Sequence, residues 1–116
     1  MSPFYFAVAI LAVGLAFPNF VRGENTPRVI EIQAKKFEFT PNEIHLKLGE
    51  PVVLRLKSLD RKHGFKVTEL GVDAVIKPGA ATDVALIPQK KGTFHFHCSV
   101  FCGSGHEGMT GVIIVD

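Results

Sequence analysis

Residues 92–115 read GTFHFHCSVFCGSGHEGMTGVIIV, in which two strand-like stretches flank a loop rich in metal-binding side chains. Residues 92–97 alternate aromatic with polar residues and 111–115 are mainly β-branched, and both patterns predict β-strands. Both cysteines of the chain lie in the loop, with the only methionine besides the initiator and one histidine: Cys98, Cys102, His106 and Met109. Thiolate and thioether donors select copper(I) and related soft ions, and imidazole suits several transition metals. The sequence therefore predicts a metal site, most simply for copper, between two adjacent strands.

The rest of the body repeats the same period-two alternation in short segments. In one of them Ile44, Leu46 and Leu48 are predicted to face the core together, opposite polar neighbours. The other segments with strand character are 30–34, 52–57 and 82–87. Turn-favouring residues separate them, at 41–42, 49–51, 60–64, 78–79 and 88–92. This pattern predicts an all-β, antiparallel β-sandwich, and it leaves residues 70–77 open as a strand, a loop or one helical turn.

Composition limits the classes of partner. The chain has 13 Lys and Arg against 11 Asp and Glu, a net charge of +2 at pH 7, with no long run of one sign. Proteins that bind nucleic acid usually have a clustered basic face, so this near balance argues against nucleic acid. With 116 residues, the chain has room for one small domain.

The first residues resemble a targeting segment. Residues 3–21 carry no charge, and the small Gly23 suits cleavage ahead of Glu24. The same run is also long enough to remain as an uncleaved membrane anchor. We therefore expect residues 1–23 to be a signal peptide or anchor and 24–116 to be the folded domain. Under either fate that domain is exported, to the periplasm or the extracytoplasmic face of a membrane.

A loop alone rarely completes a metal site, and His63 is the natural remote donor. It stands in a predicted turn, Asp60–Gly64, at the end of a strand, where sandwiches commonly hold functional residues.

The array Cys98-x3-Cys102-Gly-x2-His106-x2-Met109, with Asp60-x2-His63-Gly-Phe65 upstream, resembles the CuA domain of haem-copper (cytochrome c) oxidase subunit II. The C-terminal domain of nitrous oxide reductase is similar. The resemblance extends from about Phe37 to Asp116 and implies a cupredoxin-like Greek-key β-sandwich of about six to eight strands. It also implies two copper ions bridged by the two cysteine thiolates. His63 and His106 would each bind one ion, with Met109 and the backbone carbonyl of Val100 as weak ligands.

Such a centre implies one-electron transfer, either by a stand-alone protein or by a component like oxidase subunit II. The implied partner is a redox protein such as a c-type cytochrome or a terminal oxidase, and the chain is not expected to be catalytic alone. Phe65, Val100 and Phe101 are expected to bury the site and exclude water. Two features depart from the oxidase pattern: Val100 stands where many subunit II sequences have Glu, and the chain has no tryptophan.

Other interpretations of the same residues remain open. Two cysteines in an exported chain commonly form a disulfide. A mononuclear blue-copper site would use one cysteine, and zinc would accept two cysteines and two histidines but has no use for Met109. A protein that stores copper(I) or delivers it during oxidase assembly is the alternative of a different class. His95 and His97, which we expect to be solvent-exposed opposite a phenylalanine face, favour that alternative as extra copper-docking points.

Overall fold

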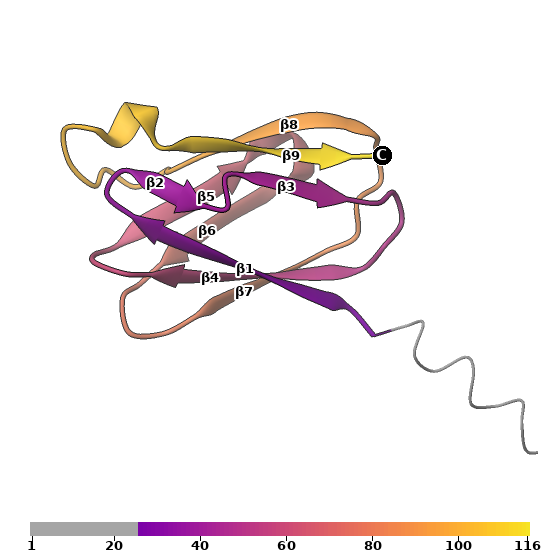
Figure 1. Ribbon diagram of the computed structural model, residues 1–116, viewed down its shortest axis with the longest axis horizontal. Coiled ribbons are helices and arrows are strands. Elements are labelled where there is room, and N and C mark those ends of the chain that lie inside the picture. Colours follow the sequence, from indigo (N-terminus) through magenta and orange to yellow (C-terminus); the bar gives the residue numbers. More distant parts are fainter. Residues whose placement is uncertain (1–25) are drawn as a thin grey trace, which may run out of the picture.

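The computed structural model describes residues 26–116, which form two β-sheets packed face to face (Figure 1). The four-stranded sheet has the order β2-β1-β4-β7, with strands β1 (Arg28–Lys35), β2 (Glu38–Thr40), β4 (Val52–Ser58) and β7 (Thr82–Leu86). The five-stranded sheet has the order β3-β9-β8-β5-β6, with strands β3 (Glu43–Leu46), β5 (His63–Val67), β6 (Val72–Ile76), β8 (Gly92–His97) and β9 (Thr110–Val115). Two short 3₁₀ turns, η3 (Thr68–Leu70) and η4 (His106–Gly108), interrupt the connections.

The predicted all-β sandwich is confirmed, with nine strands where six to eight were expected. The additional ones are β2, which is only three residues long, and β5, which begins inside the predicted turn. The segment left open, 70–77, contains the edge strand β6. The expected leader, 1–23, lies outside the described residues. Within residues 26–116, no helix has the length and apolar character needed to cross a bilayer.

The sequence predicted an antiparallel sandwich, and this prediction is wrong for two of the strand pairs. β1 pairs in parallel with β4, and β3 pairs in parallel with β9. Parallel partners need a long connection, because the chain must return to the same end before it pairs. Here the chain makes that return through the other sheet, so each sheet contains strands that are distant in sequence.

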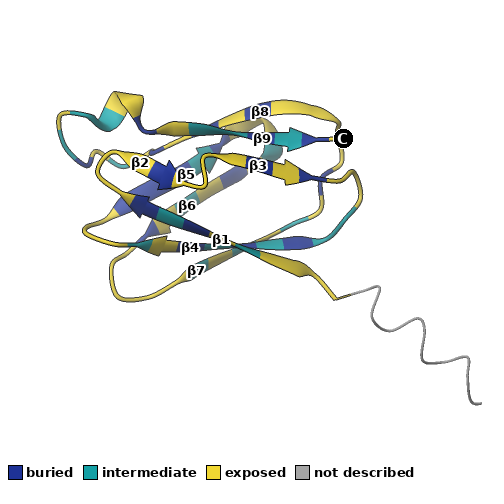
Figure 2. Cartoon of the chain, in the orientation of Figure 1, coloured by how far each residue is buried: buried dark blue, intermediate teal, exposed yellow. Residues whose placement is uncertain are grey.

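Side chains alternate between the core and solvent along most strands (Figure 2). In β4, Val52, Leu54 and Leu56 are buried, as the alternation predicted. Leu48 does not join Ile44 and Leu46 in the core and is 46% exposed. β3 ends at Leu46, and the chain turns at the positive-φ Gly49, so the period-two alternation stops there.

Three phenylalanines meet in the core between the sheets. Phe65 and Phe96 stack at a tilt with ring centroids 4.7 Å apart, and Phe39 meets both rings edge-on, at 5.8 and 5.1 Å. Edge-to-face and offset contacts of this kind stabilise beyond the area they bury. Phe65 follows His63 by two residues and Phe96 precedes Cys98 by two, so this cluster directly supports both segments that carry candidate donors.

Candidate metal centre

The loop that holds the cysteines connects neighbouring strands at one end of the sandwich, away from the C-terminus (Figure 1). β8 ends one residue before Cys98, β9 begins one residue after Met109, and the two strands pair along their whole length. The backbone N–H of Cys98 donates to the carbonyl of Met109 at 3.1 Å, which closes the loop at its base. The predicted placement of the loop between two adjacent strands is therefore confirmed.

The two thiols lie together inside this loop. The sulfur atoms of Cys98 and Cys102 are 3.7 Å apart, and both side chains are buried. A disulfide needs sulfurs about 2.05 Å apart, and here both cysteines are free thiols. The two sulfur atoms are therefore separate, and each is available as a candidate metal ligand.

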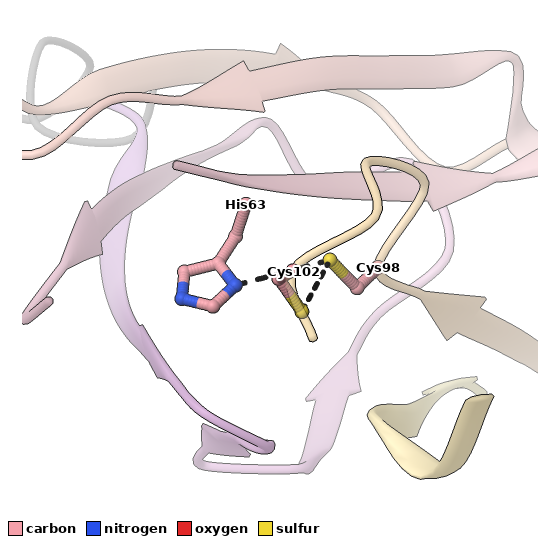
Figure 3. Close-up of side chains that lie close together, drawn as sticks. All are labelled: His63, Cys98 and Cys102. Atoms are coloured by element: carbon pink, nitrogen blue, oxygen red, sulfur yellow. Dashed lines mark hydrogen bonds between the residues drawn. The ribbon is translucent and has the colours of Figure 1, made fainter. Parts of the chain in front are cut away.

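Each sulfur faces a different imidazole. Nδ1 of His63 lies 3.9 Å from the Cys98 sulfur, and Nδ1 of His106 lies 3.7 Å from the Cys102 sulfur. Figure 3 shows the ring of His63 directed at the two cysteines, with dashed lines for its contact with Cys98 and for the contact between the two sulfurs. His63 is the first residue of β5, not a turn residue as expected, and it is the one fully buried polar side chain among the described residues.

Two weaker donors complete the arrangement. The carbonyl oxygen of Val100 lies 3.0 Å from the Cys98 sulfur, and the thioether sulfur of Met109 lies 3.8 Å from the Cys102 sulfur. Met109 is buried, and Val100 contributes only its main chain, so its side chain is free to differ in type. All six residues singled out in the sequence therefore gather at one place.

These distances fit a bound metal. A first-row ion such as zinc binds sulfur at about 2.3 Å and imidazole nitrogen at about 2.0 Å, so two such donors on one ion lie at most about 4.3 Å apart. Both nitrogen–sulfur distances, 3.9 and 3.7 Å, are within that limit. His63, Cys98 and Cys102 alone bring three donor atoms within 4.8 Å of one another. Soft sulfur with imidazole is the donor set that suits copper.

Asp60 orients the remote histidine. Its carboxylate lies 2.7 Å from Nε2 of His63, on the far side of the ring from Cys98. Burial raises the pKa of Asp60, but hydrogen bonds from the Lys36 N–H, the His63 ring and the Arg61 N–H outweigh burial and lower the pKa to about 2. Asp60 is therefore an anion at neutral pH that accepts a hydrogen bond from Nε2–H of His63 and leaves the Nδ1 lone pair available to a metal.

The thiol of Cys102 is protonated at neutral pH in the metal-free protein. Burial, followed by the hydrogen bond and the charge of Cys98, raises the pKa of Cys102 to about 11. The backbone N–H of Gly64 points at the Cys98 sulfur from 3.4 Å and would stabilise a thiolate there. Because a metal binds the thiolate, metal binding to Cys102 must release a proton.

Two residues that the sequence did not single out shape the loop. A Cβ on Gly64 would lie 2.2 Å from the hydroxyl of Ser99 and 2.9 Å from two backbone nitrogens, so only glycine lets β5 approach the loop so closely. The ring of Phe37 similarly fills the space where Gly103 and Gly105 lack side chains. Gly64 had appeared only as part of the motif, and nothing in the local sequence indicates these contacts.

One expected contribution to burial is wrong. Phe101 is 72% exposed, with its ring centroid 5.5 Å from that of the half-buried His106. A loop has no period that tells which side chain points inward, and in this loop Cys98 and Cys102 occupy the inner positions. Phe65 is buried as expected, and Val100 is half-buried.

The model of the cupredoxin-like domain family matches residues 5–115 of the chain. The chain belongs to the cupredoxin-like family. Cupredoxin-like proteins similar to this one include cytochrome c oxidase subunit 2 of Thermus thermophilus, which is 30% identical over 86 residues, 74% of this chain and 64% of that protein. Nitrous-oxide reductase of Cupriavidus necator is 30% identical over 91 residues, 75% of this chain and 14% of the enzyme. The chain spans 64% and 51% of the two Thermus thermophilus relatives, so it matches only part of each.

Solved structures show the same fold. A chain of a heme-copper terminal oxidase dimer superposes with a TM-score of 0.71 at 26% identity, covering 83% of this cupredoxin-like chain and 68% of that chain. The periplasmic domain of subunit II of cytochrome oxidase from Bradyrhizobium japonicum superposes with a TM-score of 0.71 at 20% identity, covering 77% and 83%. At that lower identity the second likeness concerns the fold alone. The resemblance inferred from the loop motif is therefore confirmed at the level of the family.

Proposed function

We propose that this cupredoxin-like chain holds a binuclear copper centre of the CuA type and transfers single electrons. One observation carries the proposal: two buried thiols, 3.7 Å apart, each face a different imidazole and a different weak donor. His63 and the Val100 carbonyl accompany Cys98, whereas His106 and Met109 accompany Cys102. A donor set divided in this way provides for two ions that share the sulfurs.

Copper in such a site would supply a one-electron couple. An electron carrier needs ligands acceptable to both oxidation states, and thiolate with imidazole in a rigid scaffold meets that need. The chain contributes rigidity, because the donors come from segments fixed by the β8–β9 ladder and the phenylalanine cluster. It also excludes water, because His63, Cys98, Cys102 and Met109 are buried. Of the two imidazoles, His63 is buried and His106 is half-buried, so we propose that His106 is the side of the site closest to a docked redox partner.

The competing sites use these residues less completely. A mononuclear blue-copper site or a zinc site would bind one ion, yet the two imidazoles face different sulfurs. A delivery protein needs a site from which the metal leaves readily, and four of the six donor residues are enclosed in the core. A disulfide would need the sulfurs to move together from 3.7 Å, and we expect it only in oxidised, metal-free protein.

We further propose that the chain works outside the cytoplasm, as a stand-alone carrier or as a subunit II-like component of a terminal oxidase. The similar proteins named above are oxidase subunits and a reductase, and one of the similar structures is a periplasmic domain. Residues 1–23 would direct export or anchor the domain 24–116, and a c-type cytochrome or the oxidase itself would be the partner. Mass spectrometry of the mature chain distinguishes cleavage ahead of Glu24 from retention of the leader.

The deciding experiment is to load the reduced protein with copper, count the metal and record optical and electron paramagnetic resonance spectra. Two copper ions per chain with a delocalised mixed-valence signal are expected. One copper with an intense blue band would replace the proposal with a mononuclear carrier. Copper(I) that transfers rapidly to an acceptor and gives no mixed-valence state would replace it with a delivery protein.

A further inference from the structure

The outer face of β8 carries two histidines that the buried site does not use. His95 and His97 are exposed, whereas Phe94 and Phe96, which alternate with them along the strand, are buried. Both imidazoles therefore leave the same face of the strand, which is the solvent side of the five-stranded sheet. The exposure expected from the sequence is confirmed.

Among residues 26–116, the imidazole rings of His95 and His97 make no side-chain hydrogen bond or ion pair, and only their backbones are paired, in the β8–β9 ladder. The contrast is His45, on β3 of the same sheet, whose Nε2 lies 2.8 Å from the Glu43 carboxylate. The cation closest in register is Lys66, which pairs with His97, but its ammonium lies 4.0 Å from the carboxylate of Asp73. Both exposed rings are therefore available to a ligand from solvent.

We propose that His95 and His97 form a second metal site, for a divalent first-row ion bound most tightly as copper(II). Residues two apart on a strand lie roughly 7 Å from each other and direct their side chains the same way, so two imidazoles can converge on one ion between them. Imidazole suits zinc, nickel and copper, and among divalent ions of this row copper(II) binds most tightly to a given nitrogen site.

The site differs in chemistry from the buried one. His97 and Cys98 are consecutive, but one faces solvent and the other the core. The outer pair offers nitrogen without sulfur, and water would fill the remaining positions of the ion. Such a site favours copper(II) over copper(I), exchanges metal readily and forms whether or not the buried site holds copper.

The test is a copper(II) titration of the full chain by equilibrium dialysis against glycine, followed by electron paramagnetic resonance of the bound ion. It is run on protein with the buried site filled, and again on a Cys98→Ser/Cys102→Ser variant that has no thiols. We expect one further copper(II) per chain in both, with a nitrogen-ligated mononuclear spectrum. The double serine variant tests the His95 and His97 site even if the buried site of the parent does not bind copper. The proposal for the outer site and the proposal for the buried centre can therefore be refuted independently.

His95→Gln and His97→Gln should each weaken this copper(II) binding by about tenfold or more. Even the loss of a residue that only hydrogen-bonds to a metal ligand lowers metal affinity by at least about that factor. The matched control is His45→Gln, an exposed histidine on the same sheet, which should bind as the parent does. Far-ultraviolet circular dichroism checks that all variants fold alike. No further copper(II) in the parent, equal affinity in the His95 and His97 variants, or an equal loss in His45→Gln would overturn the proposal.

Discussion

Asp60 and the sulfur of Cys98 lie on opposite sides of the His63 ring: the carboxylate is 2.7 Å from Nε2, and Nδ1 is 3.9 Å from the sulfur. A carboxylate in this position fixes both the tautomer and the angle of the ring. Replacing it with the amide in Asp60→Asn should therefore lower copper affinity about 10- to 100-fold. A competition titration with a copper chelator measures the change. Asp73→Asn, which alters an exposed aspartate near Lys66, is the control and should leave affinity unchanged.

The same carboxylate predicts a pH dependence of stability in the metal-free protein. Its pKa is lowered from 3.8 to about 2 in the folded state, so the folded state favours the ionised form. Its contribution to stability is complete above about pH 4 and is lost as the pH falls toward 2. Urea unfolding at a series of pH values should show less of this acid destabilisation in Asp60→Asn than in the parent. Equal slopes in the two proteins over that range would contradict the role assigned to Asp60.

Each cysteine is needed for the proposed binuclear centre. Cys98→Ser removes the sulfur that faces His63, and Cys102→Ser removes the one that faces His106. Either change should abolish the delocalised mixed-valence signal, because a single thiolate remains to be shared. Electron paramagnetic resonance with copper analysis measures the result. An unchanged binuclear spectrum in either variant would refute the ligand assignment.

Met109 should affect the reduction potential of the copper centre without being required for copper binding. Its sulfur lies 3.8 Å from that of Cys102, and its side chain is buried. Leucine has a similar volume and usually costs less than about 1.5 kcal/mol in such a position. Met109→Leu should therefore keep two coppers per chain and shift the reduction potential, as voltammetry of the loaded protein will measure. Loss of one copper would instead make Met109 a strong ligand.

The backbone of β5 lies directly against the loop at Gly64. A Cβ there would meet the backbone nitrogens of Ser99 and Val100 at 2.9 Å, so the loop would have to move. We expect Gly64→Ala to cost about 1–3 kcal/mol of stability and to weaken copper binding, as over-packing does elsewhere. Gly108→Ala is the matched control, because a Cβ there would meet nothing within 4 Å. Denaturant unfolding and copper titration of both variants test the difference, and equal behaviour would contradict it.

The sequence predicted most of what depends on local periodicity and spacing. The apolar positions of β4 and the opposite faces of β8 follow from alternation, since each side chain's direction is set by the strand itself. The six candidate donor residues followed from the motif, and they lie close together in the structure. Val100 was included because the motif implies a carbonyl there, and its side chain gives no signal.

What the sequence did not predict depends on contacts between distant segments. Phe37 packs on the glycines of the loop more than 60 residues later, and Gly64 lies against Ser99. The exposure of Phe101 was wrong for a related reason, because a loop side chain is oriented by its tertiary surroundings and not by a repeat. The sequence did not predict the start of β5, because the strand begins with His63 and Gly64, and polar and glycine residues of this kind are typical of turns.

β5 and β8 share a single registered pair, Lys66 with His97, although they are neighbours in the middle of the five-stranded sheet. At the end where this ladder is missing, His63 projects from β5 and Cys98 follows β8. An ion bound by both would crosslink two segments 35 residues apart and restrict the unfolded chain much as a covalent bridge does. The bound copper would then both transfer electrons and stabilise the fold, so copper depletion would remove the redox activity and lower the stability of the domain together.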